Sequence, residues 1–104
     1  MLGIIKKWLG GNNAVDYKAL LMQGAIIVDV RTDAEFKTGH INNAINIPLD
    51  QAKVKAAELL KKNKPVITCC RSGNRSAMAK NIFTAAGIEC YNGGAWNTLN
   101  QKII

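Results

Sequence analysis

Three short runs of apolar and β-branched residues constrain the fold of this 104-residue chain more than any other feature. They are AIIVDV at 25–30, PVITC at 65–69 and IECY at 88–91, with a weaker fourth run, AINIP, at 44–48. The first two runs are almost continuous rather than alternating, which is typical of strands covered on both faces. They therefore predict the strands of a buried sheet.

Segments with a helical spacing of apolar residues separate these runs. The first helix is predicted over 17–23, between Asp16 as a start signal and Gly24 as a stop. The second is predicted over 49–63, with apolar positions at Val54, Ala57, Leu59 and Leu60. The third is predicted over about 75–86, burying Ala79, Ile82, Phe83 and Ala86. Strands that alternate with helices predict an α/β domain with a largely parallel sheet.

Length and composition limit the class of protein. A chain of this length is one domain, and its hydrophobic fraction of 48% with 20% charged residues is typical of a globular protein. No stretch approaches the roughly 20 consecutive apolar residues that span a bilayer. We expect an N-terminal segment at 1–13, a short amphipathic turn or tail, and a folded domain at 14–104. The alternative, that residues 2–9 touch a membrane, is the less favoured one.

Charge and cysteine usage indicate the compartment and the partners. The net charge of +7 attracts anions. The lysines cluster at 6–7 and 53–64 without interleaved aromatic residues, so we expect no nucleic-acid partner. Three cysteines, two of them adjacent, do not form a disulfide framework and favour a reducing, cytoplasmic compartment. The single histidine, His40, is remote in sequence from every cysteine, and we expect no metal site.

The stretch CRSGNRS, from Cys70 to Ser76, lies between a predicted strand and a predicted helix. Ligand sites of open α/β sheets lie beyond the carboxyl ends of the strands. A loop of this composition can converge its backbone N–H groups into an anion-binding nest in front of a helix N-terminus. Such a setting beside arginine lowers a cysteine pKa from about 8.5 to roughly 3.5–7.5. Cys70 is therefore predicted to be a nucleophile that needs no histidine base.

Two arginines in this loop break a local rule. Arg71 and Arg75 flank the predicted helix start, where the helix dipole favours acidic residues. Residues that break a local rule without structural benefit tend to mark functional sites. Two guanidinium groups beside a thiolate would hold an oxyanion by charge-assisted hydrogen bonds. From the loop alone, a buried inert cysteine with two surface arginines stays open as the alternative.

Three motifs of the chain together resemble the rhodanese-like (sulfurtransferase) domain family over nearly the whole sequence. They are the CRSGNRS loop, the stretch IVDVRTDAEF at 27–36 followed by GHI at 39–41 and AINIP at 44–48, and the pair Gly93-Gly94 with Trp96. The chain departs from the family pattern at Asn42-Asn43, where the family usually has Pro-Gly. Its last motif is also compressed, and we interpret Trp96 as a core residue rather than a wall of the site.

The resemblance implies a five-stranded, mainly parallel sheet with helices on both faces. It also implies a reaction in which Cys70 takes a sulfane sulfur from thiosulfate or another persulfide donor and carries it as a persulfide, without a cofactor. The expected partners are a small anionic sulfur donor and, as acceptor, a thiol or a thioredoxin-like protein. The family's substrate-binding loop corresponds here to Arg71, Ser72, Gly73, Asn74, Arg75 and Ser76.

Other functions on the same architecture stay open. A persulfide carrier or a binding module that docks on a partner protein would also use the positive surface. A phosphatase or arsenate reductase is less favoured, because the relatives with those activities have five residues between Cys and Arg and this loop has four. A phosphoryl group needs a wider ring of donors than a single sulfur atom.

The remaining polar and sulfur-bearing residues are interpreted as structural. Asp29 and Arg31 lie on one face at the end of a strand, and we expect a paired network that fixes the loop. His40 is expected to be a turn residue, because a persulfide mechanism gives it no proton to carry. Cys69 points away from Cys70 if the strand alternates, and we interpret it, like Cys90, as a core residue.

Overall fold

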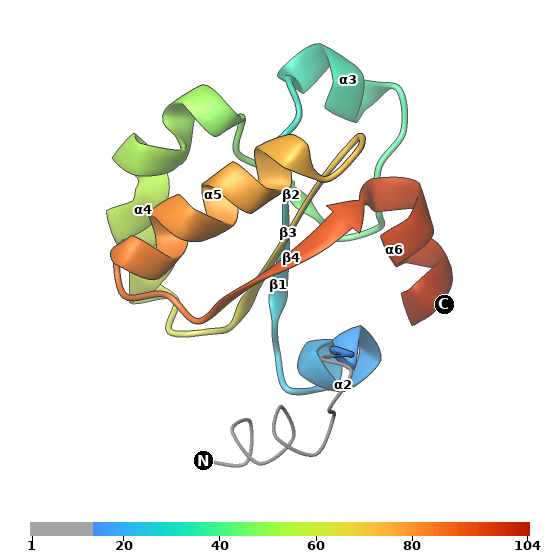
Figure 1. Cartoon of the computed structure of the whole chain (residues 1–104), viewed down its shortest axis with the longest axis horizontal. Helices are drawn as coiled ribbons and strands as arrows, with labels where there is room; N and C mark the ends of the chain where they lie inside the picture. Colours follow the sequence, from blue (N-terminus) through green and yellow to red (C-terminus); the bar gives the residue numbers. More distant parts are fainter. Residues whose placement is uncertain (1–13) are drawn as a thin grey trace.

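The computed structural model describes residues 14–104, which form a parallel sheet between two layers of helices (Figure 1). The sheet consists of four strands, β1 (Ile26–Asp29), β2 (Ile45–Asn46), β3 (Val66–Cys70) and β4 (Cys90–Ala95). Their order is β2-β1-β3-β4, and every neighbouring pair is parallel. All carboxyl ends therefore lie at one edge of the sheet. The N-terminal segment expected at 1–13 lies outside the described residues.

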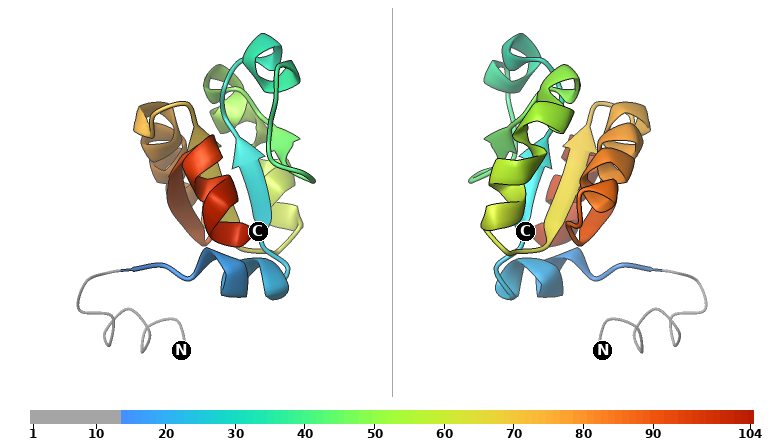
Figure 2. Two further views of the ribbon diagram at one scale, coloured as in Figure 1. Left: turned by 90° about the vertical axis from the view of Figure 1, so that its right-hand side faces the viewer. Right: turned by 90° about the vertical axis from the view of Figure 1, so that its left-hand side faces the viewer.

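Helices cover both faces of the sheet, as predicted. They are α2 (Tyr17–Met22), α3 (Asp33–Lys37), the 3₁₀ turn η1 (Leu49–Gln51), α4 (Ala52–Lys61), α5 (Asn74–Ala85) and α6 (Trp96–Ile103). Helices α4 and α5 pack on one face, and α6 with α2 packs on the other (Figure 2). Helix α3 lies beyond the carboxyl ends of the strands (Figure 1). None of the helices in residues 14–104 is long and apolar enough to cross a membrane.

The alternation of side chains along the strands divides the core in two. Strand β3 is buried along its whole length, and it directs Val66 and Cys70 to one face and Ile67 and Cys69 to the other. The first face packs against Ala52, Ala56 and Leu59 of α4 and Ala79 and Phe83 of α5. The second packs against Leu20 of α2 and Leu99 of α6. The continuous apolar runs of the sequence thus correspond to strands covered on both faces.

The strand count corrects one expectation. The resemblance implied five strands, mainly parallel, whereas the described residues form four strands, all parallel. The four predicted runs account for all of them. No fifth strand forms within 14–104, where the other apolar residues lie mostly on the helices α2, α4, α5 and α6.

Two predicted elements have different limits from those expected. The last strand was predicted at 88–91 but begins at Cys90, because the Ile88 N–H closes the end of α5 by donating to the Phe83 carbonyl. The helix predicted over 49–63 is divided into η1 and α4. Of its four expected apolar positions only Leu59 is buried. Val54 is 80% exposed and Ala57 and Leu60 are exposed as well, because the face toward the sheet carries Ala52 and Ala56 with Leu59. Helices α3 and α6 were not predicted.

Candidate active site

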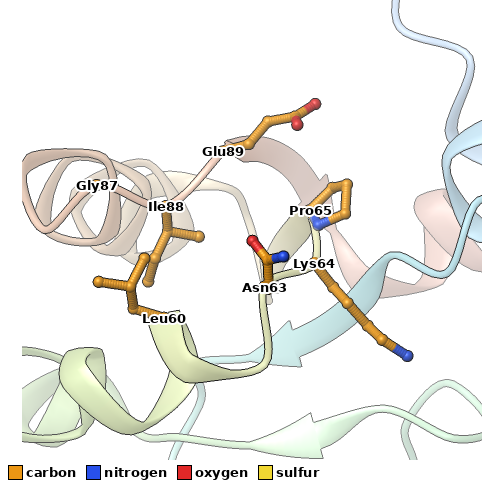
Figure 3. A pocket seen from close by; sticks show the side chains of 7 residues that line it. All are labelled: Leu60, Asn63, Lys64, Pro65, Gly87, Ile88 and Glu89. Carbon is orange, nitrogen blue, oxygen red and sulfur yellow. The ribbon is translucent and has the colours of Figure 1, made fainter.

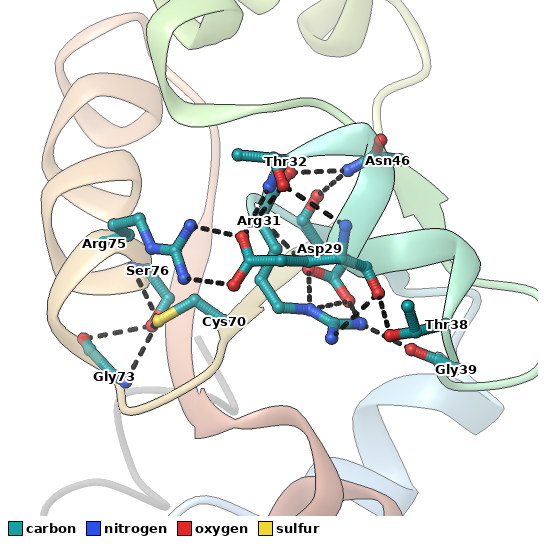
Figure 4. Close-up of polar contacts among 11 residues, drawn as sticks. Asp29, Arg31, Thr32, Thr38, Gly39, Asn46, Cys70, Gly73, Arg75 and Ser76 are labelled. Atoms are coloured by element: carbon teal, nitrogen blue, oxygen red, sulfur yellow. Dashed lines mark hydrogen bonds and ion pairs between the residues drawn. The ribbon is translucent and has the colours of Figure 1, made fainter.

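The loop after β3 surrounds the sulfur of Cys70 with hydrogen-bond donors (Figure 4). Cys70 is the last residue of β3, and α5 begins four residues later at Asn74. Gly73 has φ 106°, a left-handed conformation that costs glycine little. In this conformation its N–H donates to Cys70 Sγ over 3.0 Å, and the N–H of Ser76, in the first turn of α5, donates to the same sulfur over 3.4 Å.

These contacts decide the ionisation of the thiol. The Cys70 residue is only 1% exposed, and burial raises its pKa. The hydrogen bond between Cys70 and the Ser76 hydroxyl, with those from the N–H groups of Ser76, Gly73 and Ser72, outweighs burial and holds the pKa of Cys70 below its ordinary value. Three of the six predicted loop residues thus direct donors at the sulfur.

The two arginines of the loop have different surroundings. Both terminal nitrogens of Arg75 bond the Glu35 carboxylate, at 2.7 and 3.0 Å, so this guanidinium is engaged with α3 rather than aimed at the sulfur. This ion pair explains why a basic residue is tolerated at the start of α5. Arg71 is exposed, and its side chain forms no ion pair or hydrogen bond with the residues of 14–104. Asn74 is exposed as well. Of the two arginines of the loop, Arg71 is therefore the one whose guanidinium is unpaired among residues 14–104.

Glu35 of α3 contacts Arg75 of the Cys70 loop, and the sequence did not predict this contact. Its carboxylate bonds Arg75 and also completes a capping box with Thr32 at the start of α3. The bond from Arg75, with the bonds from Thr32, lowers the pKa of Glu35 to about 2. The Thr-x-x-Glu spacing signals the capping box in the sequence. Nothing local signals the contact with Arg75, which is 40 residues away.

Acidification is expected to weaken this link between α3 and α5. The pKa of Glu35 is depressed in the folded state, so its stabilising contribution is complete above the ordinary glutamate pKa of 4.5 and is lost as the pH falls from about 5 toward 2. Glu35→Gln should therefore have a lower free energy of unfolding than wild type at pH 7, and this difference should shrink as the pH falls from about 5 toward 2. Urea unfolding at several pH values measures the free energy of unfolding of both proteins. Asp33→Asn removes a carboxylate of the same helix, and an equal effect of that control would contradict the prediction.

Asp29 and Arg31 form the buried pair that the sequence predicted. Arg31 Nη2 lies 2.7 Å from Asp29 Oδ2, and Nε bonds both carboxylate oxygens. Arg31 also donates to the carbonyls of Glu35 and Gly39 and lies over the ring of Trp96, 4.7 Å from its centroid. The pair therefore fixes the segment around α3 directly, and the Glu35–Arg75 ion pair links this segment to the Cys70 loop. Trp96 packs against the second core cluster, as expected.

The prediction that Cys69 and Cys90 are core residues is confirmed, and His40 makes local contacts on α3. Cys69 and Cys90 are both buried, on opposite faces of the sheet, and all three cysteines are free. Burial raises the pKa of the Cys69 thiol and raises that of Cys90 to about 12. The ring of His40 stacks on Phe36, and its Nδ1–H donates to the Phe36 carbonyl. Within residues 14–104, no three His, Cys, Asp or Glu side chains gather as metal ligands would.

A pocket of about 160 Å³ lies at the opposite edge of the sheet, where β3 and β4 begin (Figure 3). It is open to solvent, and it includes none of the predicted site residues. Its lining consists of Leu60, Asn63, Lys64, Pro65, Gly87, Ile88 and Glu89. The donors around Cys70 therefore define the candidate site.

The fold and the site together define an α/β domain with a thiol held by backbone amides in front of a helix N-terminus. Residues 13–97 match the family model of the rhodanese-like domain, and the chain belongs to this family. Solved structures with a similar fold include proteins of the same family. The protein "rhodanese with anions from E. coli" superposes with a TM-score of 0.65 at 32% identity, covering 71% of this chain and 89% of that one.

Two curated relatives carry names that bear on chemistry. Thiosulfate sulfurtransferase PspE of Escherichia coli is 36% identical over 61 residues, which are 58% of this chain and 59% of PspE. Adenylyltransferase and sulfurtransferase MOCS3 of Drosophila persimilis is 36% identical over 92 residues, which are 77% of this chain but 20% of that protein. The chain thus spans about three fifths of the first relative and a fifth of the second.

Proposed function

We propose that this protein is a sulfurtransferase that moves a sulfane sulfur from thiosulfate or another persulfide donor to a thiophilic acceptor through Cys70. The observation that carries the proposal is the set of N–H donors on the Cys70 sulfur, which lowers the pKa of a buried thiol. A thiolate at neutral pH is the nucleophile that such a transfer needs. Membership of the family and the name of PspE support the same activity.

The proposed reaction has two steps. The Cys70 thiolate attacks the outer sulfur of thiosulfate, so that a new S–S bond forms on Cys70 while the S–S bond of thiosulfate breaks and sulfite leaves with its electron pair. A nucleophile such as cyanide then attacks the outer sulfur of the persulfide, and Cys70 leaves as a thiolate. Electrons balance without a separate oxidant or reductant. Ping-pong kinetics follow from this order.

The loop residues have distinct roles in this proposal. The N–H groups of Ser72, Gly73 and Ser76 stabilise the negative sulfur of the thiolate and of the persulfide. Arg71, which is exposed and unpaired among the described residues, attracts the anionic donor. Arg75 positions the loop through Glu35. Because Cys70 is 1% exposed, the loop moves when a donor reaches the sulfur.

A persulfide carrier is the second candidate. Five lysines of α4 and the segment after it are exposed, namely Lys53, Lys55, Lys61, Lys62 and Lys64. The match to one fifth of MOCS3 supports this candidate only in that a similar domain occurs within a longer protein named as an adenylyltransferase and sulfurtransferase. For a carrier, transfer to an acidic protein acceptor falls steeply with added salt while transfer to cyanide does not.

The test of the proposed function is the intact mass of the reduced protein after brief incubation with thiosulfate. Wild type is expected to gain about 32 Da, one sulfur atom, and to lose it again on addition of cyanide, because the persulfide is a covalent intermediate. Cys70→Ser should gain nothing. Cys69→Ser is the matched control and should gain the same mass as wild type.

Two results would contradict the proposal. One is a sulfur adduct that persists in Cys70→Ser. The other is a folded wild-type protein that takes sulfur from neither thiosulfate nor a protein persulfide. Release of phosphate from an aryl phosphate, without sulfite release from thiosulfate, would favour the phosphatase alternative.

A further inference from the structure

Asn92 lies against the Cys70 loop although it belongs to the neighbouring strand β4. Its side chain bridges to the loop at two points. Oδ1 is 2.7 Å from the Ser76 hydroxyl oxygen, and Nδ2 donates to the Gly73 carbonyl over 3.4 Å. Ser76 in turn lies beside the sulfur, with its hydroxyl oxygen 3.4 Å from Cys70 Sγ. Two hydrogen bonds therefore connect Asn92 to the reacting sulfur, with Ser76 between them.

The surrounding donors fix the orientation of the Asn92 amide. The Gly94 N–H lies 2.9 Å from Asn92 Oδ1, and a backbone N–H can only donate, so the atom that faces it must be the amide oxygen. An amide oxygen can only accept. The Ser76 hydroxyl, 2.7 Å from the same oxygen, must therefore donate to it.

This arrangement determines what Ser76 presents to the sulfur. A serine hydroxyl has one proton, and its two nearest acceptors are oxygens, Asn92 Oδ1 at 2.7 Å and the Gly73 carbonyl at 3.0 Å. The lone pairs of the hydroxyl then face Cys70, and the neutral thiol donates to them. A thiolate has no proton to give. To stabilise it, the Ser76 hydroxyl must turn toward the sulfur and give up its bond to Asn92.

We propose that Asn92 is a positioning residue that competes with the Cys70 sulfur for the single proton of Ser76 and thereby sets how much thiolate the loop carries. Asn92 touches neither the sulfur nor the donor. It acts through Ser76 alone, and it favours the neutral thiol in the resting protein. The inference rests on the proposed function only in taking Cys70 as the reacting thiol.

The test is the pKa of Cys70, read from the pH dependence of its alkylation by iodoacetamide with the Cys70 peptide followed by mass. Asn92→Ala removes the nearer of the two oxygens that compete for the Ser76 proton, and it should lower this pKa by about half a unit to one unit, the equivalent of one hydrogen bond. Ser76→Ala should raise it. In the Ser76→Ala background, Asn92→Ala should have no further effect, because there is no proton left to compete for.

A purely structural role of Asn92 gives a different pattern. If Asn92 only holds the loop in shape, its loss misaligns the N–H donors, raises the pKa of Cys70 and does so in the Ser76→Ala background as well. That result, or an unchanged pKa in Asn92→Ala, would overturn the proposal. Asn97→Ala is the matched control, since the Asn97 side chain on α6 is exposed and bonds only the neighbouring Thr98 N–H.

A second variant covers the case in which Asn92→Ala does not fold. Asn92→Asp keeps an acceptor for the Ser76 and Gly94 donors and strengthens it with a charge. It should raise the pKa of Cys70, and the rise should shrink in the Ser76→Ala background. A rise of equal size in both backgrounds comes from charge alone and would overturn the proposal.

The charged and titratable groups around the sulfur are the same in all these variants except Asn92→Asp. They are Arg75 on α5 with its partner Glu35 on α3, the Asp29–Arg31 pair at the end of β1, the Cys69 thiol on β3 and the exposed Arg71 of the loop. Alkylation needs no sulfur donor. A missing thiosulfate adduct and a failed pKa cycle are therefore separate results, each against its own proposal.

Discussion

Replacement of Arg31 by leucine is expected to lower the free energy of unfolding by about 3–5 kcal/mol, the cost of leaving one member of a buried ion pair without its partner. The Asp29 carboxylate is fully buried, and the Arg31 side chain supplies hydrogen bonds to both of its oxygens. Without the guanidinium, those oxygens lose charge-assisted donors that solvent cannot replace. Urea unfolding followed by circular dichroism measures the change.

Two controls accompany the Arg31 variant. Lys37→Ala breaks the exposed ion pair with Asp33 and should leave the unfolding midpoint nearly unchanged. Asp29→Asn combined with Arg31→Leu removes both charges and should recover part of the lost stability. A loss below about 1 kcal/mol for Arg31→Leu would show that the pair is not the main support of the segment around α3.

Replacement of Gly93 by alanine is expected to lower the free energy of unfolding by about 3 kcal/mol, at the upper end of the range for overpacking. A Cβ atom at this position would lie 2.8 Å from both Leu99 Cδ2 and the Thr68 carbonyl oxygen, and 2.9 Å from Ile67 Cγ2. One of these atoms belongs to the backbone of β3, so a rotamer change cannot relieve the collision. The two strands would have to separate beside the Cys70 loop.

Gly94→Ala is the matched control for this prediction. Nothing lies within 4 Å of a Cβ at Gly94, and its φ of 82° adds only the strain of a left-handed residue, about 1–2 kcal/mol. Both variants are measured by the same unfolding experiment. Equal losses would mean that backbone conformation, rather than the close approach of β4 to β3, explains the glycine pair.

The sequence predicted the elements whose signals are local. The strand runs at 25–30 and 65–69 read as buried because they are nearly continuous in apolar residues, and α2 has its start and stop at Asp16 and Gly24. Helix α3 was not predicted, because it has only five residues and none of them is buried. Helix α6 carries an apolar stripe of Trp96, Leu99 and Ile103, but no side chain caps its start at Ala95, so the sequence lacks a start signal there.

The site was predictable to a similar extent. Cys70 and its loop follow from chain order alone, since a cysteine between a strand and a helix start is a local pattern. The partners that tune the loop do not. Glu35 meets Arg75 across 40 residues, and Asn92 meets Ser76 across 16, so only the packing of α3 and β4 against α5 brings them together.

The directions of the three cysteines have a consequence for the fate of a sulfur bound on Cys70. Cys69 is adjacent in sequence but lies on the opposite face of the sheet. Cys90 shares the face but pairs with Val66 at the start of β3, four residues and about 13 Å along the strand from Cys70. Neither thiol can close a disulfide onto the persulfide. Under the proposed mechanism, a sulfur taken up by Cys70 therefore has no intramolecular acceptor thiol, and it leaves only when a second molecule collects it.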